Sequence, residues 1–117
     1  TLRDLQNVAK TASRPWETAK AFERSAPISE LVPAAEVGHP DRGAITLTVN
    51  GETRQSGDLA QMIWKLPEIV SVLSRHFALA PGDLILTGTP AGVGPVRRGD
   101  ALVGEVEGIA RLETRVA

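Results

Sequence analysis

The sequence predicts a β-rich α+β fold, and three observations support this class. Residues 44–49 alternate apolar and polar side chains and run into an Asn-Gly pair, the strongest short-range signal for a β-hairpin. Two more strand-like runs, 101–108 and 110–117, close the chain. Helical spacing of apolar residues is confined to residues 2–12 and 67–78. The 117 residues suffice for one domain, or part of one.

The first predicted element is a short helix that reaches about Ala12. Thr1 and Asp4 have the spacing of a capping box, and apolar residues recur on one helical face. These apolar residues are Leu2, Leu5, Val8 and Ala9.

Residues 13–36 form a long segment with three prolines and no sustained period. Within it we expect only brief extended pairings, at residues 20–22 and 29–32. A segment of this kind is either disordered or functional. We expect order, because four apolar side chains can attach it to a core, namely Trp16, Phe22, Ile28 and Leu31.

A turn-rich stretch, 38–43, precedes the predicted hairpin, whose second strand follows an Asn50-Gly51 turn and reaches about Gln55. Asp58 is placed to cap a helical turn over 59–64, and Pro67 to begin a helix that ends near Ala78. The apolar face of that helix is expected to comprise Ile69, Val70, Leu73 and Phe77.

The last third begins with a turn at 80–83 and the apolar run 84–88, which predicts a short buried strand. A glycine-rich loop follows. The two closing strands, 101–108 and 110–117, are expected to meet at a turn that contains Gly108.

Composition and charge exclude several classes of partner. Thirteen basic and fourteen acidic residues give a net charge of −1 without long runs of one sign, so neither nucleic acid nor a membrane surface is indicated. No apolar run approaches the roughly 18 residues of a membrane span. The absence of cysteine excludes thiolate chemistry and fits a reducing compartment. We therefore expect a small-molecule partner and a cytoplasmic location, and, since the chain starts at Thr1, a preceding segment.

The stretch 84–94, LILTGTPAGVG, contains three glycines and no titratable side chain. It lacks the lysine and the spacing of a P-loop and does not match GxGxxG, which argues against a nucleotide. Two readings stay open on the residues alone. The glycines shape a tight loop, or Thr87 or Thr89 and a row of backbone amides hold a small carboxylate.

The remaining polar candidates each have an ordinary structural explanation. His39 and His76 stand alone and fit surface or helix-cap positions better than a catalytic base. Lys20 lies between two aromatic residues, where desolvation would make it a poised cation, although a solvated surface lysine fits the composition better. Arg3 and Gln6 share one face of the first helix, which also fits a solvated face.

The stretches TLRDLQ, RPWETAKAFERSAPIS, VNGETRQ, QMIWKLPEIVSVLS and LAPGDLILTGTPAGVGPVRRGD occur in this order. Together they resemble the C-terminal half of the fumarylacetoacetate hydrolase family over essentially all of residues 1–117. Within the family the resemblance is strongest to bacterial fumarylpyruvate hydrolases, relatives of the acylpyruvases. It implies a mixed β-sandwich roll, here incomplete at the N-terminus, in which residues 1–117 are the C-terminal part of one catalytic domain.

The resemblance also implies a homodimer that binds Mg²⁺ or Mn²⁺ through acidic side chains and cleaves the C–C bond of a 1,3-diketo acid with water. In this family the metal chelates the diketo group as a Lewis acid. The expected reaction converts fumarylpyruvate to fumarate and pyruvate in gentisate breakdown. The family's metal ligands and water-activating pair would precede Thr1, so no metal ligand is expected in this chain.

The resemblance assigns roles to polar residues that remain. Arg3 and Gln6 match residues that reach the substrate's oxygens, and Lys20 matches a catalytic lysine beside the metal that stabilises negative charge. Thr89 matches the threonine that holds the keto acid's carboxylate, and we assign the adjacent Gly88 to the same binding loop.

Two alternatives to hydrolysis remain. One is an oxaloacetate decarboxylase or a hexenedioate isomerase or decarboxylase of the same family, which would lack the water-activating pair. The other is a non-catalytic fragment that binds carboxylates weakly or pairs with another copy.

Overall fold

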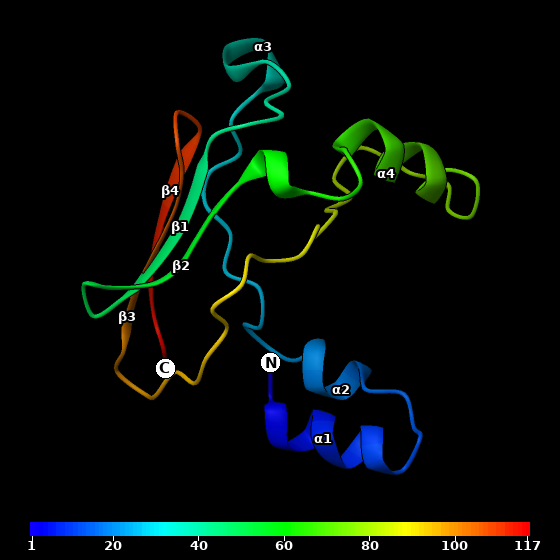
Figure 1. The fold of residues 1–117 in the computed structure, drawn as a ribbon. Coiled ribbons are helices and arrows are strands. Elements are labelled where there is room, and N and C mark those ends of the chain that lie inside the picture. Colours follow the sequence, from blue (N-terminus) through cyan, green and yellow to red (C-terminus); the bar gives the residue numbers. More distant parts are fainter.

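Four antiparallel strands form one sheet in the order β2-β1-β3-β4 in the computed structural model, which describes residues 1–117 (Figure 1). The strands are β1 (Ala44–Val49), β2 (Glu52–Asp58), β3 (Ala101–Val106) and β4 (Ala110–Arg115). β1 and β2 form one hairpin, β3 and β4 form another, and β1 pairs with β3. The predicted hairpin, the two closing strands and the α+β class are confirmed.

The Asn50-Gly51 turn has positive φ at both residues, 53° and 84°, as a tight hairpin turn requires. Asn50 also ties this turn to the start of β3, because its side chain accepts from the Ala101 backbone N–H at 2.9 Å and donates to the Asp100 carboxylate at 2.9 Å. The backbone N–H of Arg97 and this amide hold the pKa of Asp100 below its usual value.

The helical elements are α1 (Arg3–Thr11), α2 (Glu17–Lys20), α3 (Ala34–Val37), the 3₁₀ turn η1 (Leu59–Gln61) and α4 (Leu66–Leu73). The predicted first helix is confirmed, but its predicted capping box is wrong. Leu2 occupies the N-cap position without a side-chain cap, and the hydroxyl of Thr1 instead accepts from the Lys20 ammonium at 3.0 Å.

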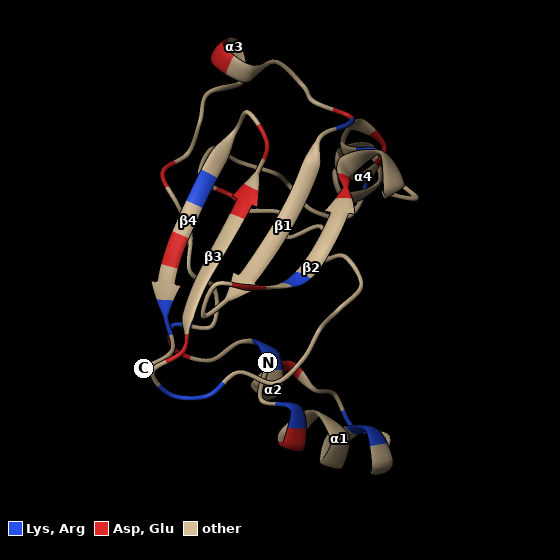
Figure 2. Ribbon diagram, turned by 60° about the vertical axis from the view of Figure 1, so that its left-hand side comes forward, with Lys and Arg blue, Asp and Glu red and all other residues tan.

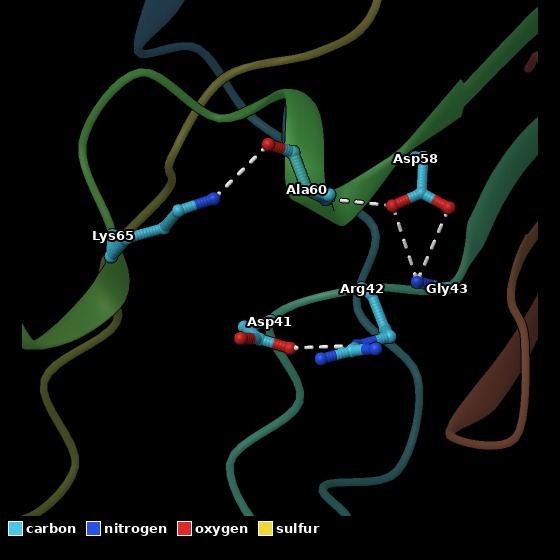
Figure 3. A network of polar contacts seen from close by, with 6 residues as sticks. All are labelled: Asp41, Arg42, Gly43, Asp58, Ala60 and Lys65. Carbon is cyan, nitrogen blue, oxygen red and sulfur yellow. Dashed lines mark hydrogen bonds and ion pairs between the residues drawn. The ribbon is translucent and has the colours of Figure 1, made fainter.

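The predicted cap at Asp58 is confirmed and holds the end of β2 (Figure 3). Its carboxylate accepts from the backbone N–H of Ala60 at 2.7 Å and from that of Gly43 at 3.3 Å. The Lys65 ammonium donates to the Ala60 carbonyl at 3.0 Å. Asp58 thus joins η1 to the start of β1, because one carboxylate satisfies donors from both segments.

The helix α4 ends at Leu73, five residues earlier than predicted, and Pro67 is its second residue. Of the expected apolar face, only Ile69 and Leu73 are half-buried, whereas Val70 and Phe77 are 44% and 63% exposed. Short helices depend on packing for their stability, and the residues near Phe77 find no surface to pack against.

The segment 13–36 contains the short helix α2 and the start of α3 instead of brief extended pairings. Phe22 is half-buried, but Trp16, Ile28 and Leu31 are exposed, so the expected attachment to a core is wrong for these three. The physical reason is that little of the chain lies in an interior, since 4 of 117 residues are buried.

The predicted buried strand at 84–88 is also wrong, because these residues form no strand and Leu86 is 81% exposed. A strand requires a neighbour for its backbone N–H and C=O groups. None of the four strands pairs with this segment, and no backbone N–H from Leu84 to Val96 donates a hydrogen bond within the chain.

The accessible surface of the chain is 9342 Å². A compact protein of 12.4 kDa is expected to expose about 6,100 Å², so roughly 3,200 Å² lies open beyond that value. The radius of gyration, 15.8 Å, likewise exceeds the roughly 13.4 Å of a compact chain of this length. The sheet and its flanking segments therefore form a thin assembly with a small core. No helix has the length and hydrophobicity needed to span a membrane.

Candidate functional site

Two of the four buried residues are glutamines, Gln6 and Gln55, and each belongs to a different group of candidate residues. Buried polar side chains in proteins are almost always hydrogen-bonded. Their partners define what we call the helical cluster, which comprises Thr1, Arg3, Gln6 and Lys20, and the loop cluster, which comprises Gln55 and Gly88–Gly92.

The helical cluster forms where α1 packs on α2 (Figure 1). Ala19 is 1% exposed and its carbonyl accepts from the Leu2 backbone N–H at 3.0 Å, which holds the two helices together. On α1 the Arg3 guanidinium donates to the Gln6 side-chain oxygen at 2.7 Å, across one helical turn. Gln6 is 5% exposed, so this contact fixes its amide in a buried position.

Lys20 ends α2, and its ammonium donates to the Thr1 hydroxyl at 3.0 Å. Its side chain is exposed, so the solvated lysine applies and not the desolvated cation between Trp16 and Phe22. The cation over the Trp16 ring is instead Lys10, whose ammonium lies 5.1 Å from the ring centroid. Lys20 still has N–H donors left for a further acceptor, since an ammonium carries three.

The loop cluster attaches the glycine-rich segment to β2. Gln55 is 7% exposed, and its side-chain Nε2 donates to the Thr89 hydroxyl oxygen at 2.8 Å and to the Pro90 carbonyl at 2.7 Å. Gly92 has a φ of +98°, and a methyl group placed there would overlap the Arg54 carbonyl oxygen. The reading in which glycine shapes a tight loop therefore applies at Gly92.

Gly88 and Thr89 are exposed, and Gly88 has a φ of +101° with open space around the position of a side chain. The backbone N–H groups in the segment Gly88–Gly92 donate no hydrogen bond within the chain. Free amides beside a hydroxyl are an arrangement that suits an anion.

Gly88, Thr89 and Pro90 line two neighbouring hollows of about 410 and 490 Å³. The larger lies on the sheet and is also lined by Pro27 and Ser29, so the chain that follows α2 reaches the loop cluster. Neither hollow is lined by a lysine or an arginine. The acidic residues Asp58 and Glu105 line the smaller and the larger hollow respectively. A carboxylate would therefore meet neutral donors on the wall formed by Gly88 and Thr89.

No hydrogen bond or ion pair joins the helical cluster to the loop cluster. The structure brings Arg3, Gln6 and Lys20 together, and separately Gly88 and Thr89, but it does not bring Lys20 to Thr89. His39 and His76 are both exposed and belong to neither cluster.

Divalent metals require oxygen, nitrogen or thiolate ligands, and no group of three His, Cys, Asp or Glu side chains is placed to hold one. The two charged members of the helical cluster are cations, which would repel a metal ion. Basic and acidic residues are otherwise interspersed over the elements (Figure 2). The residues present therefore do not fit a divalent metal on their own.

Gln55 is the site residue that sequence reasoning missed. Its position at the end of the predicted hairpin strand gave no sign that it is buried. Arg54 is an extra residue in β2, because Leu47 faces Gln55 while Thr48 faces Thr53, and such a bulge displaces the alternation of side chains.

The profile of the fumarylacetoacetate (FAA) hydrolase C-terminal family matches residues 1–117. The chain is 49% identical over 116 residues to a fumarylpyruvate hydrolase of Ralstonia sp., and 49% identical over 117 residues to oxaloacetate tautomerase YcgM of Escherichia coli strain K12. Each alignment covers 99% of this chain, but 60% and 53% of these relatives. The chain thus spans little more than half the length of the two curated relatives.

The chain is also similar to a solved structure of a fumarylpyruvate hydrolase. The fumarylpyruvate hydrolase of Pseudomonas aeruginosa, in complex with Mn²⁺ and pyruvate, superposes with a TM-score of 0.94 at 54% identity. The superposition covers 98% of this chain and 49% of that one.

Proposed function

Because the chain belongs to the fumarylacetoacetate hydrolase family, we propose that it is the C-terminal part of a single catalytic domain that cleaves acylpyruvates. The proposed reaction is fumarylpyruvate plus water to fumarate plus pyruvate. Water oxygen bonds to the acyl carbonyl carbon, the adjacent C–C bond breaks, and its electron pair leaves with pyruvate as an enolate that is then protonated. The similarity to fumarylpyruvate hydrolases supports this reaction.

The segment Gly88–Gly92 is proposed to bind the carboxylate of the pyruvoyl end. The observation that carries this assignment is the row of unpartnered amides beside the Thr89 hydroxyl, on the wall of two hollows. The charged residues that line these hollows are Asp58 in the smaller and Glu105 in the larger, so the Gly88–Gly92 wall supplies the donors. Pyruvate, the common product of acylpyruvate cleavage, offers a carboxylate and a keto oxygen. Neutral donors suit this group, since a titrating side chain would attract or repel it according to pH.

The helical cluster is proposed to act on the charge that develops during cleavage. An enolate gains negative charge at its oxygen, and a lysine ammonium is a strong donor for such an oxygen. Lys20 has the charge and the exposed N–H donors for this role, while Arg3 and Gln6 would orient the substrate's other oxygens. The two clusters would meet around one substrate in the longer protein.

The divalent metal of the proposed enzyme would be held by residues outside this chain, because the residues present do not fit one. The remaining properties proposed from the family resemblance are a mixed β-sandwich roll, a homodimer, and a place in cytoplasmic aromatic catabolism.

A second candidate function is oxaloacetate tautomerisation, favoured by the equal identity to YcgM. Oxaloacetate also carries a carboxylate next to a keto group, so the loop cluster would bind it in the same way. Tautomerisation moves a proton between carbon and oxygen and requires no attacking water. The residues that distinguish it from hydrolysis would therefore lie outside the segment Gly88–Gly92, which we call the carboxylate cradle.

The test is an assay of the longer protein with fumarylpyruvate and with oxaloacetate, each with Mn²⁺ and with a chelator. We expect metal-dependent release of fumarate and pyruvate. Tautomerisation of oxaloacetate without cleavage of fumarylpyruvate would establish the second candidate instead. Calorimetric titration of residues 1–117 with Mn²⁺ should show no tight binding, and tight binding would contradict the assignment of the ligands to other residues.

A further inference from the structure

We propose that Gln55 is a positioning residue for Thr89, which sets the Thr89 hydroxyl as a hydrogen-bond donor toward a carboxylate. This inference rests on the proposed function, because it concerns how the carboxylate cradle works. Gln55 contacts the loop from β2 and also lines the larger hollow, but its amide N–H groups are directed at the Thr89 hydroxyl and the Pro90 carbonyl. Its effect would pass entirely through Thr89.

The orientation of the Gln55 amide follows from its neighbours. Its Nε2 lies 2.7 Å from the Pro90 carbonyl and 3.5 Å from the Ala91 carbonyl. Carbonyl oxygens only accept hydrogen bonds, so the NH₂ end of the amide must face them. The opposite orientation would place the amide oxygen against two carbonyl oxygens.

The same NH₂ group lies 2.8 Å from the Thr89 hydroxyl oxygen. Because Nε2 can only donate, Thr89 Oγ1 must accept in this contact, and the hydroxyl proton points elsewhere. The proton of Thr89 is then available to a ligand in the adjoining hollow. A carboxylate accepts hydrogen bonds, so the arrangement favours it over a ligand that only donates.

The shape of β2 favours the contact between Gln55 and Thr89. The bulge at Arg54 displaces Gln55 from the regular alternation, and bulges of this kind re-aim side chains. Gly92 fits only as glycine against the Arg54 carbonyl, and at Gly57 an added methyl would lie 3.0 Å from the Pro90 ring. Close approach at both glycines brings the loop within reach of the Gln55 amide.

Burial makes the contact specific. Gln55 is 7% exposed, so water does not compete freely for its amide. Replacing it with methionine keeps the length of the side chain and removes every donor. Replacing it with an ionised glutamate puts an acceptor where Nε2 lies, and the Thr89 proton would turn toward that acceptor. The Thr89 oxygen would then face the substrate's carboxylate and repel it.

The experiment measures pyruvate as a competitive inhibitor of the longer enzyme loaded with Mn²⁺, in a double-mutant cycle of Gln55→Met and Thr89→Val. We expect Thr89→Val to weaken pyruvate binding about tenfold or more, the value of a hydrogen bond to a charged group. Gln55→Met alone should weaken it roughly three- to tenfold. In the Thr89→Val background, Gln55→Met should change it less than about twofold, since the hydroxyl that it orients is absent.

A second variant keeps the test decisive if Gln55→Met does not fold. Gln55→Glu should weaken pyruvate binding at least as much as Thr89→Val does. Thr53→Val is the matched control, because Thr53 lies on the same strand, is exposed, and makes no side-chain hydrogen bond. It should leave the inhibition constant unchanged.

The outcomes separate this inference from the proposed function. If Thr89→Val leaves pyruvate binding unchanged, the carboxylate cradle itself is wrong. If Thr89→Val weakens binding but Gln55→Met does not, or weakens it equally in both backgrounds, the cradle stands and Gln55 only supports the loop. Either of these last results would overturn the positioning role.

Discussion

The four-stranded sheet and the segment Leu84–Val96 are both rich in apolar residues, yet they differ in how their backbones are satisfied. Each strand of the sheet pairs with a neighbour over most of its length. The segment makes no backbone hydrogen bond through its N–H groups, and Leu84 and Leu86 are 56% and 81% exposed. The strands therefore find hydrogen-bond acceptors for their backbone N–H groups within the chain, whereas the segment does not.

A segment without strand pairing can still be held in place. Gln55, Gly57 and Gly92 fix its central residues to β2 by a side chain and two close approaches, without any strand pairing. The free amides remain available to a ligand. The same absence of pairing that leaves the fold thin thus gives the candidate site its donors.

The largest expected effect comes from breaking the contact between the two regions with Gly92→Ala. The added methyl would overlap the Arg54 carbonyl, and a φ of +98° is unfavourable for alanine. We expect a loss of about 2–4 kcal/mol in unfolding free energy, or release of the loop with loss of pyruvate binding. Chemical denaturation of the longer protein measures the first and inhibitor titration the second.

Gly94→Ala is the matched control for this prediction. Gly94 lies in the same segment, but no atom comes within 4 Å of an added methyl, and its φ is not in the left-handed region. We expect its unfolding free energy to stay within about 0.5 kcal/mol of the original. Equal destabilisation by both substitutions would show that Gly92 does not anchor the loop.

A second prediction concerns the positive charge of Lys20 in the helical cluster. Lys20→Met in the longer enzyme should lower turnover by about a hundredfold or more, because the enolate loses its ammonium donor. Lys10→Met should have little effect on turnover, since Lys10 lies over Trp16. Unchanged turnover in steady-state assays of the Lys20 variant would remove this lysine from the reaction.

The smallest effect concerns the sheet and pH. Because hydrogen bonds lower the pKa of Asp100 in the folded chain, its carboxylate adds stability above the unfolded pKa of about 4. That contribution is lost as pH falls through the lower, folded pKa. In thermal unfolding, Asp100→Asn should be less stable than the original chain at neutral pH, and the difference in stability should shrink in acid. A difference in stability that grows in acid would contradict the lowered pKa of Asp100.

Much of the fold could be predicted from the sequence because the relevant signals are local. The Asn50-Gly51 turn, the alternation in β1 and the Asp58 cap depend on residues close to one another in the chain. The run at 84–88 carries the pattern of a buried strand, but a strand forms only where a partner lies beside it. Ile28 and Leu31 fail as core residues for a related reason, since no surface of this chain covers them.

The candidate site was predictable only in part. Arg3, Gln6 and Lys20 are assigned only by resemblance to a family, because no local pattern distinguishes them from solvated side chains. The glycine-rich stretch indicates a hydroxyl at Thr87 or Thr89, and the resemblance selects Thr89. Gln55 was not assigned, because its burial follows from a bulge and from the return of the loop 34 residues later. Such non-local contacts leave no periodic signal.

The most direct test of the carboxylate cradle is hydrogen exchange of the longer protein with and without pyruvate. We predict that pyruvate slows exchange at the amides of Gly88, Thr89, Ala91 and Gly92, and leaves the paired amides of β1 and β3 unchanged. Saturating pyruvate that leaves these four amides exchanging at their original rate would contradict the account.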